Sequence, residues 1–341
     1  MKKYGVMIVG TGWVSGEHIR AFEMNPYAQV VAIVSRSYEK GRAKADEYDL
    51  GDRCKVYTSY EEGLKDPNVD IVVICTPNDM HCQQTIMAAE AGKHILIEKP
   101  VALSWEDTLR MNAAVEKAGV KTLVGYVLHY NPLFMTAKKL QKDFIGDLYY
   151  VETDYFHRVE SNIPCYSWTC KKEVGGSSLL AGGCHAVDAA RWFMQDEVVS
   201  VYAQSCKLRT DLEFDGTLSM ILKFRSGAVA KIGSSYDTIS PYVFNLHLCG
   251  SKGTLWNEKL WSPSMIPEQR DYMELPVLTP NSGDVKHHPF PEEVAHFMDC
   301  IIHDKQTDCP LSDAVKTQEI VFAADLSAAT GKVVELPLDR P

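Results

Sequence analysis

The chain has 341 residues, of which 45% are hydrophobic and 23% charged, and its formal net charge is −10. This composition is typical of a soluble globular protein with one large or two ordinary domains. The acidic balance argues against nucleic acid and anionic membranes as partners, since both require a basic surface. No apolar run reaches the roughly 18 residues of a membrane helix. The segment MKKYGVMIVG lacks the long apolar core of a signal peptide, so we expect a cytoplasmic protein.

The ten cysteines are scattered and form no C-x-x-C pair. In a cytosolic chain this pattern predicts reduced, mostly core-filling thiols. A metal site built from Cys165, Cys170, Cys184 and His185 would match no known zinc-ligand spacing, so we expect no metal.

Residues 1–124 alternate short apolar runs with amphipathic segments. The apolar runs are Val6–Val9, Val30–Val34, Ile71–Cys75, His94–Ile97 and Thr122–Val124, and the helical segments lie near 15–25, 38–48, 59–65, 79–91 and 104–118. Strand–helix alternation predicts parallel strands with helical crossovers on both faces, and continuously apolar strands suit a sheet buried on both sides. We therefore predict an N-terminal α/β Rossmann domain with a doubly wound parallel sheet.

Residues 125–341 are expected to form a second α/β domain with a large, mainly antiparallel open sheet covered on one face. Its predicted strands are Leu148–His157, Val198–Leu208, Thr217–Arg225, Ala228–Tyr236 and Tyr242–Cys249. Arg225–Ala228 and Gly250–Gly253 resemble tight turns. Helices are predicted at 132–142, 178–194, 292–303 and 311–330, and residues 257–291 are expected to be a long surface loop.

A glycine-rich turn follows the first predicted strand and opens a helix. It reads Gly10-Thr11-Gly12-Trp13-Val14-Ser15. The first two glycines let backbone N–H groups approach a pyrophosphate, and the helix N-terminus favours its negative charge. Ser15 takes the usual place of a third glycine and is small enough for close packing. The position of this turn predicts binding of NAD or NADP.

The second predicted strand ends in Ser35-Arg36, where NAD-binding folds usually carry an acidic residue. A guanidinium beside a hydroxyl could hold a 2′-phosphate, which favours NADP. Alternatively, Arg36 stacks on the adenine of NAD.

Two further strands end in polar segments at the carboxyl edge, where open α/β sheets bind ligands. One segment is Thr76-Pro77-Asn78 with His81 behind it, and the other is Glu98-Lys99-Pro100. Lys99 follows a buried strand and precedes a rigid proline, so partial burial could lower its pKa enough for acid–base work. The alternative is a surface lysine paired with Glu98.

The second half offers candidate substrate-binding groups. His185 and Asp188 are three residues apart on a predicted helix and share one face of it. The clusters His129-Tyr130-Asn131 and His157-Arg158, together with Trp168, could line a sugar pocket, because aromatic rings stack on sugars and polar groups bind hydroxyls.

The chain resembles the glucose–fructose oxidoreductase / inositol dehydrogenase / rhizopine-catabolism (Gfo/Idh/MocA) family over nearly its whole length. The motifs that carry the resemblance are GTGWVSGEHIRAF, ICTPNDMH, AAEAGKHILIEKP, HYNP, the GGSSL and GGCHAVD block, and PLSDAVKTQEIVFAADLSAATGK. The resemblance implies that Lys99 and His185 are catalytic and that Asp188 contacts substrate. It also implies a homodimer or homotetramer formed through the open sheet. The implied cofactor contacts are Gly10, Gly12, Trp13, Ser35, Arg36, Thr76, Asn78, His81, Glu98 and Trp168.

One position departs from the family pattern. Many of its dehydrogenases carry an aspartate four residues before the histidine, and here that residue is Ala181. Either Lys99 and His185 suffice, or the vacated space admits a bulkier substrate, such as a glycoside oxidised at its 3-position.

These observations predict an enzyme that transfers hydride between nicotinamide C4 and a secondary hydroxyl of a sugar, cyclitol or glycoside, while Lys99 and His185 handle the proton. Two alternatives stay open. One is an NAD-dependent glycosidase that oxidises, eliminates and re-reduces without net cofactor turnover. The other is a catalytically inactive nucleotide-binding regulator.

Overall fold

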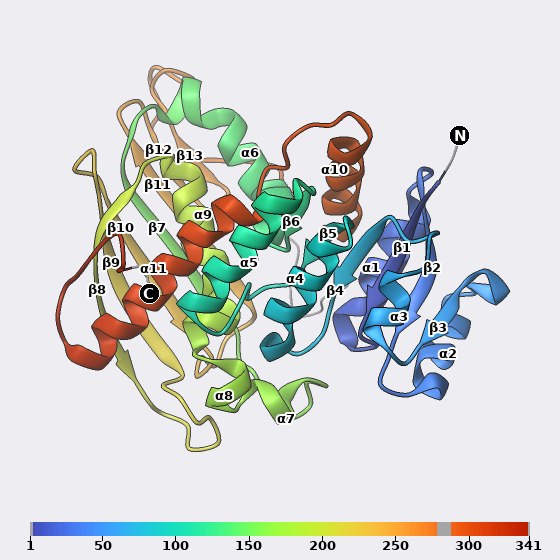
Figure 1. Ribbon diagram of the computed structural model, residues 1–341. Coiled ribbons are helices and arrows are strands. Elements are labelled where there is room, and N and C mark those ends of the chain that lie inside the picture. The colour runs from blue at the N-terminus through green and yellow to red at the C-terminus, as the bar shows by residue number, and fades with distance from the viewer. Residues whose placement is uncertain (1–2, 278–287, 340–341) are drawn as a thin grey trace. The chain divides into compact units, whose positions relative to one another are not determined.

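A computed structural model describes residues 3–277 and 288–339, which divide into two compact units. Unit 1 comprises residues 1–126, 161–168 and 289–316, and unit 2 comprises residues 127–160, 169–288 and 317–341. Figure 1 shows the elements of both.

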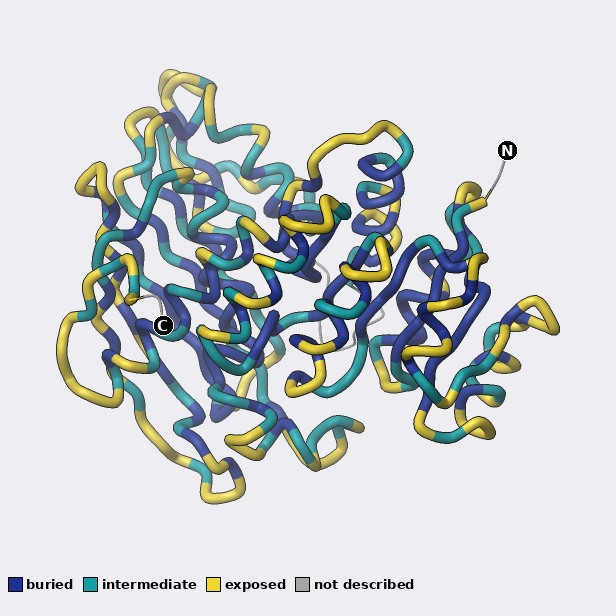
Figure 2. The backbone as a smooth tube through the Cα atoms, in the orientation of Figure 1, coloured by how far each residue is buried: buried dark blue, intermediate teal, exposed yellow. Residues whose placement is uncertain are grey.

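Unit 1 is built on a six-stranded parallel sheet in the order β3-β2-β1-β4-β5-β6. The strands are β1 (Tyr4–Val9), β2 (Ala28–Val34), β3 (Lys55–Tyr57), β4 (Ile71–Ile74), β5 (His94–Ile97) and β6 (Thr122–Val124). The order reverses direction between β1 and β4, which makes that point the expected ligand crevice of a doubly wound fold. All residues of β4 are fully buried, as a sheet covered on both faces requires (Figure 2).

Helices flank this sheet. They are α1 (Trp13–Met24), α2 (Tyr38–Glu47), α3 (Tyr60–Leu64), α4 (His81–Glu90), α5 (Trp105–Ala118) and α10 (Phe290–Ile302), with short 3₁₀ turns η1 (Gly51–Arg53) and η2 (Asn78–Met80). Helix α4 packs against α5, and α1 packs against α10. Local sequence sets their ends: Ser104 caps α5 by accepting from the Asp107 N–H, and Gly119 ends it in a left-handed conformation.

The Rossmann sheet expected from the sequence is confirmed, with one strand added to the five apolar runs. The added strand is β3, which has a single aliphatic residue, Val56, and so produces no apolar run. It is an edge strand that pairs only with β2 among the described strands.

Unit 2 contains a nine-stranded mixed sheet in the order β14-β13-β12-β11-β7-β10-β9-β8-β15. The strands are β7 (Leu148–Phe156), β8 (Val198–Cys206), β9 (Thr217–Phe224), β10 (Val229–Ser235), β11 (Val243–Gly250), β12 (Thr254–Trp256), β13 (Lys259–Trp261), β14 (Met273–Glu274) and β15 (Val334–Glu335). Only β7 and β10 pair in parallel among these strands. The large, mainly antiparallel sheet is therefore confirmed.

One face of this sheet is covered by helix α9 (Cys184–Met194), which packs on β7 and β10. Thr153 on β7 donates to the carbonyl of Ala186 at 2.8 Å, and Ser327 on α11 (Leu311–Thr330) accepts from the Ala203 N–H of β8 at 2.9 Å. The opposite face carries exposed side chains, including Tyr202 and Ile221. The alternation of buried and exposed residues along β9 reflects this one-sided cover.

The remaining elements of the second half are short or irregular. They are the 3₁₀ turn η3 (Val127–Tyr130), α6 (Pro132–Leu140), the π-helical turn η4 (Gln141–Ile145), α7 (Tyr166–Thr169), α8 (Lys172–Gly175) and the π-helical turn η5 (Leu179–Gly183). Two predictions need correction here. The helix expected over 178–194 begins with η5, and the loop expected over 257–291 contains β13 and β14, while its residues 278–287 lie outside the described ones.

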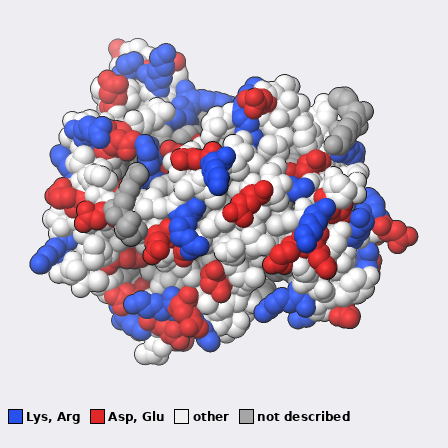
Figure 3. All heavy atoms as spheres, in the orientation of Figure 1, with Lys and Arg blue, Asp and Glu red and all other residues white. Residues whose placement is uncertain are grey.

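No helix in the described ranges is long and apolar enough to cross a bilayer. All ten cysteines lie within those ranges, and each is a free thiol. On the face shown in Figure 3, basic and acidic side chains are interspersed.

Candidate active site

The glycine turn between β1 and α1 has the geometry that a dinucleotide requires. Gly10 has φ +104°, and a Cβ there would lie 2.7 Å from the carbonyl oxygen of Cys75, so only glycine fits. A Cβ on Gly12 would meet nothing within 4 Å, which leaves open space beside the turn. No side chain of the described residues caps α1, and its first turn holds no acidic residue. Its N–H groups therefore suit a pyrophosphate.

Ser35 and Arg36 follow β2 at the same edge of the sheet. Ser35 is buried and its hydroxyl accepts from the Ser37 N–H at 3.4 Å. The Arg36 side chain is exposed and makes no hydrogen bond or ion pair with any described residue. It is thus available to a phosphate or an adenine ring of a bound cofactor.

The segments after β4 and β5 are tied together by His81. Its ring nitrogens lie 2.8 Å from the carbonyl oxygen of Pro100 and 3.0 Å from that of Thr76. Burial lowers the pKa of His81, and the two carbonyl oxygens oppose that shift. The Thr76 hydroxyl donates to Gln84 at 2.6 Å, and Asn78 is buried beside the start of α4. These contacts fix the backbone at the carboxyl edge where the cofactor is expected.

Glu98 and Lys99 come directly after β5. The Glu98 carboxylate lies 2.7 Å from Nε2 of His18 on α1, and its second oxygen accepts from the Lys99 backbone N–H at 3.3 Å. Burial disfavours the charged form, but His18 and the nearby Lys99 outweigh it and lower the pKa of Glu98. A carboxylate beside Lys99 is therefore built into unit 1.

In unit 2, His185 lies in the first turn of α9 among aromatic rings. Its ring stacks on Tyr155 with a centroid separation of 6.2 Å and makes a T-shaped contact with Phe244 at a centroid separation of 5.8 Å. The Tyr155 hydroxyl lies 3.1 Å from Nδ1 of His157, whose ring stacks on Tyr242 at 4.1 Å. Burial and then Tyr155 raise the pKa of Tyr242 well above its usual value, so the ring stays a neutral phenol. The cluster orients His185 through its packing.

His129 and Asp188 are brought together by the fold of unit 2. Nε2 of His129 lies 2.7 Å from one oxygen of Asp188, and the Thr317 hydroxyl donates to the other at 3.1 Å. Trp192 stacks on the His129 ring at 4.5 Å, and Asp188 is 1% exposed. His129 and Thr317 therefore each hold one oxygen of Asp188, and its contact with substrate stays a prediction.

The other candidate residues of the second half also have structural partners. The Asn131 side chain caps α6 by accepting from the Leu133 N–H at 2.9 Å, and Tyr130 is buried. Trp168 lies in α7 and is half-buried. Their proposed contacts with substrate or cofactor stay predictions.

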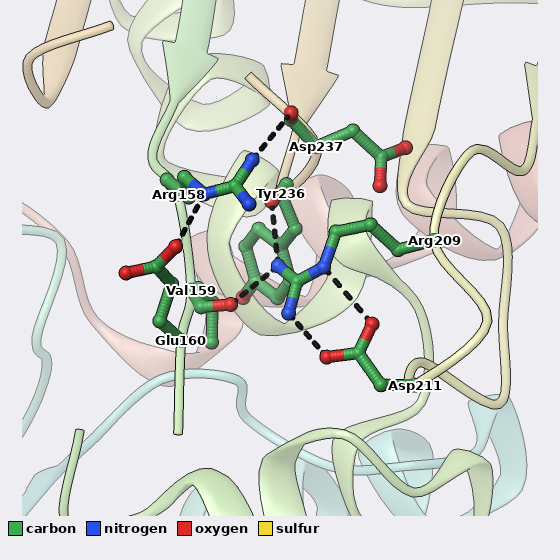
Figure 4. A network of polar contacts seen from close by, with 7 residues as sticks. All are labelled: Arg158, Val159, Glu160, Arg209, Asp211, Tyr236 and Asp237. Atoms are coloured by element: carbon green, nitrogen blue, oxygen red, sulfur yellow. Dashed lines mark hydrogen bonds and ion pairs between the residues drawn. The ribbon is translucent and has the colours of Figure 1, made fainter. Parts of the chain in front are cut away.

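Arg158 belongs to a polar network at the ends of β7 and β10 (Figure 4). Its guanidinium donates to the carbonyl of Asp237 at 3.3 Å and pairs with Glu160. Arg209 donates to the carbonyl of Tyr236 at 3.2 Å and pairs with Asp211. Two arginines thus fix the loops at the end of the sheet that carries His157.

The comparisons with known proteins agree with this architecture. Residues 4–126 match the oxidoreductase family with an NAD-binding Rossmann fold, and residues 134–256 match the GFO/IDH/MocA C-terminal domain. The chain belongs to the GFO/IDH/MocA oxidoreductase family. It is accordingly an NAD(P)-dependent oxidoreductase, and the family resemblance of the motifs is confirmed.

Individual relatives of this GFO/IDH/MocA chain are dehydrogenases and reductases. It is 31% identical over 258 residues to 1,5-anhydro-D-fructose reductase of Ensifer adhaerens, which covers 74% of this chain and 73% of the relative. It is 30% identical over 231 residues to D-xylose 1-dehydrogenase (NADP(+)) 2 of Haloferax volcanii, with 68% and 69% covered. Aldose-aldose oxidoreductase of Caulobacter crescentus, solved with glycerol, matches with a TM-score of 0.83 at 26% identity, covering 98% of this chain and 100% of that one.

Several residues of the candidate site have no local signal in the sequence of this GFO/IDH/MocA chain. His18 is 80 positions from Glu98, so no local spacing connects them. Tyr155 and Phe244 support His185 from neighbouring strands. The alternation of β7 places Tyr155 on the face of Val151 and Thr153, and that pattern could have identified it as a neighbour of α9.

Proposed function

We propose that this oxidoreductase interconverts a secondary hydroxyl and a carbonyl on a sugar, cyclitol or glycoside, with Lys99 as the proton acceptor. The observation that carries the proposal is the place of Lys99. It lies at the carboxyl end of β5, between Glu98 and Pro100, in the unit that carries the glycine turn. A lysine beside a carboxylate at a ligand-binding sheet edge can hold and release a proton.

A bound NAD(P) would supply the nicotinamide that accepts or returns the hydride. The residues expected to hold it are the backbone N–H groups of Gly10–Val14, with Ser35 and Arg36 toward the adenosine end. Thr76, Pro77, Asn78, His81, Glu98 and Trp168 are the further proposed cofactor contacts.

The protein's own contribution is orientation and proton management. Lys99 accepts the hydroxyl proton during oxidation and returns it during reduction, and His185 hydrogen-bonds the same hydroxyl. The stacking of Tyr155 on His185 limits the rotation of the imidazole. His129, Tyr130, Asn131, His157, Arg158 and Asp188 are the proposed substrate-binding residues.

The experiment combines the purified protein with NAD or NADP and a panel of inositols, aldoses and glycosides, and follows the absorbance of reduced nicotinamide. Stoichiometric reduction supports a dehydrogenase. Sugar release without net reduction supports the oxidation–elimination–reduction glycosidase, and binding without chemistry supports the inactive regulator.

Ala181 supports a narrower proposal, that the substrate is larger than a free inositol. It lies in η5, is 6% exposed, and stands where family dehydrogenases often carry an aspartate. A side chain without a carboxylate leaves room for a glycoside oxidised at its 3-position. A panel in which free inositols are oxidised well and glycosides not at all would contradict this proposal.

A further inference from the structure

Three ionisable side chains meet inside unit 1 behind Lys99. They are His18 on α1, Glu98 after β5 and Glu293 on α10. His18 and Glu293 are 0% exposed and Glu98 is 9% exposed. Burying three such groups is costly unless their charges are arranged to offset one another.

The strongest contact is the 2.7 Å hydrogen bond between Nε2 of His18 and Oε1 of Glu98. An ionised carboxylate can only accept, so Nε2 must carry the proton. The His18 and Phe290 rings make a T-shaped contact with their centroids 4.9 Å apart, which restricts rotation of the imidazole. The other oxygen of Glu98 accepts from the Lys99 N–H at 3.3 Å.

Lys99 and His81 also face Glu98 and favour its ionised form, whereas Glu293 and Cys75 beside it are uncharged. Burial and then the negative charge of Glu98 raise the pKa of Glu293 well above its usual value, and neither Glu293 oxygen has a hydrogen-bond partner among the described residues. Burial, Glu98 and Glu293 also raise the pKa of the Cys75 thiol, and burial lowers the pKa of His81. The negative charge of the cluster is therefore concentrated on Glu98.

We propose that His18 is a positioning residue that keeps Glu98 ionised and thereby sets the pH range in which Lys99 can accept a proton. This inference rests on the proposed role of Lys99. His18 touches neither substrate nor cofactor in this proposal and acts through Glu98 alone.

The direction of the effect follows from electrostatics. A carboxylate beside an ammonium group stabilises the charged form, so it raises the pH at which lysine becomes neutral. Without that carboxylate, Lys99 becomes a usable base at lower pH. Without His18, Glu98 loses the hydrogen bond that opposes its burial and becomes easier to protonate, which has the same consequence for Lys99.

The test is the pH profile of kcat/KM for alcohol oxidation in wild type, Glu98→Gln, His18→Leu and the double variant. We expect the acidic limb of Glu98→Gln to move to lower pH by about one unit. His18→Leu should move it in the same direction and no further. The double variant should match Glu98→Gln, because both changes remove the same charge.

Two variants serve as controls. Glu293→Gln replaces an uncharged acid by an amide of the same shape, so the profile should stay at the wild-type position. His18→Gln keeps an N–H donor toward Glu98 and should restore most of the wild-type profile, which a loss of packing alone would not do. Thermal unfolding and cofactor titration verify that each variant is folded.

Unchanged acidic limbs in folded Glu98→Gln and His18→Leu would overturn the inference, as would additive shifts in the double variant. If His18→Leu does not fold, the other two variants still test the proposal, because we expect a shifted acidic limb in Glu98→Gln and a nearly wild-type limb in His18→Gln. Lys99→Ala separates the two proposals. Normal turnover in that variant would contradict the role of Lys99. An inactive Lys99→Ala, together with unshifted acidic limbs in Glu98→Gln and His18→Leu, would contradict only the role of His18.

Discussion

At the residue scale, the polar side chains of unit 1 divide into those that hold the backbone and those left for ligands. Asp66 is buried and hydrogen-bonded to neighbouring groups, whereas Arg36 is exposed and makes no polar contact with the described residues. Buried polar groups of the first kind contribute to stability, and exposed ones of the second kind contribute to binding. The two kinds give different predictions.

The preference for NADP or NAD should depend on Arg36. If its guanidinium holds the 2′-phosphate, Arg36→Ala should raise the KM for NADP about tenfold or more, because a charge-assisted hydrogen bond is lost. The KM for NAD should change little. Steady-state kinetics with both cofactors check this, with the exposed Lys40→Ala as a control for a general loss of positive charge. Equal losses for both cofactors would instead favour stacking on adenine.

Asp66 predicts a pH-dependent contribution to stability. Its side chain is 1% exposed and accepts from Lys55 at 2.9 Å and Tyr57 at 2.8 Å. Burial opposes ionisation, but hydrogen bonds from Asn68, Lys55 and Tyr57 outweigh it and lower the pKa of Asp66 from 3.8 to about 2. A lowered pKa stabilises the fold above about pH 4, and this stabilisation is lost as the pH falls toward 2.

Asp66→Asn should therefore reduce the free energy of unfolding of the protein by about 2 kcal/mol at pH 7. The difference from wild type should shrink as the pH falls from about 4 to about 2. Denaturant unfolding at several pH values measures it, with the exposed Asp52→Asn as the matched control. A difference that is constant over this pH range would show that the hydrogen bonds are not the cause.

At the element scale, strand ends were easier to predict than irregular helices. Long aliphatic runs identified β1, β2, β4 and β5, and hence the position of Lys99, because a buried parallel strand requires continuous apolar residues. Helix 178–194 was predicted as continuous, although Leu179–Gly183 form a π-helical turn. We attribute this π-helical turn to tertiary packing, since Gly182 and Gly183 pack against Tyr155 and Ser234 of strands that are distant in the sequence.

A side chain at Gly182 should disturb the packing of this turn. A Cβ there would lie 2.5 Å from Cε1 of Tyr155 and 2.9 Å from the hydroxyl of Tyr236, so Gly182→Ala must displace the Tyr155 ring that stacks on His185. We expect kcat/KM for the sugar to fall about tenfold or more and stability to drop by about 1–3 kcal/mol. The Kd of the cofactor, which belongs to unit 1, should be unchanged.

Kinetics and cofactor titration of Gly182→Ala make this measurement. Tyr155→Phe is the comparison variant, because it keeps the stacked ring and removes the hydroxyl that contacts His157 and Tyr242. Wild-type kinetics in a folded Gly182→Ala would mean that the position of Tyr155 does not matter to His185.

At the scale of the whole molecule, one face of the unit 2 sheet carries exposed side chains and is covered by no helix of the described residues. Tyr202 on β8 and Ile221 on β9 are directly paired across the strands and are 42% and 48% exposed. Exposed aliphatic and aromatic side chains in one place often mark a protein interface. The homodimer or homotetramer expected through the open sheet would bury this pair.

Ile221→Asp should therefore shift the protein toward smaller assemblies, because a carboxylate would be desolvated in the interface. Light scattering coupled to size-exclusion chromatography measures the mass of the assembly. The control is Ser219→Asp, two residues from Ile221 on the same face of β9, which shows whether any acidic substitution has this effect. A wild type that is already monomeric at high concentration would contradict the proposed interface.

The sequence predicted the two sheets and the carboxyl-edge candidates because these depend on local patterns. It could not connect His18 with Glu98 or His129 with Asp188, which lie 80 and 59 positions apart and meet only through tertiary folding. Asp188 illustrates the limit most clearly. Helical spacing places it on the face of His185, but no local pattern predicts that His129 and Thr317 contact its carboxylate.

Lys99→Ala tests most directly whether Lys99 accepts the proton, assayed by stopped-flow absorbance of reduced nicotinamide with the best substrate of the panel. We expect turnover to fall at least about 100-fold, since general base catalysis contributes that much or more. The Kd of NAD(P) should stay within about threefold of wild type, because the pyrophosphate turn is untouched. Turnover near the wild-type rate would contradict the assignment of Lys99 as the proton acceptor.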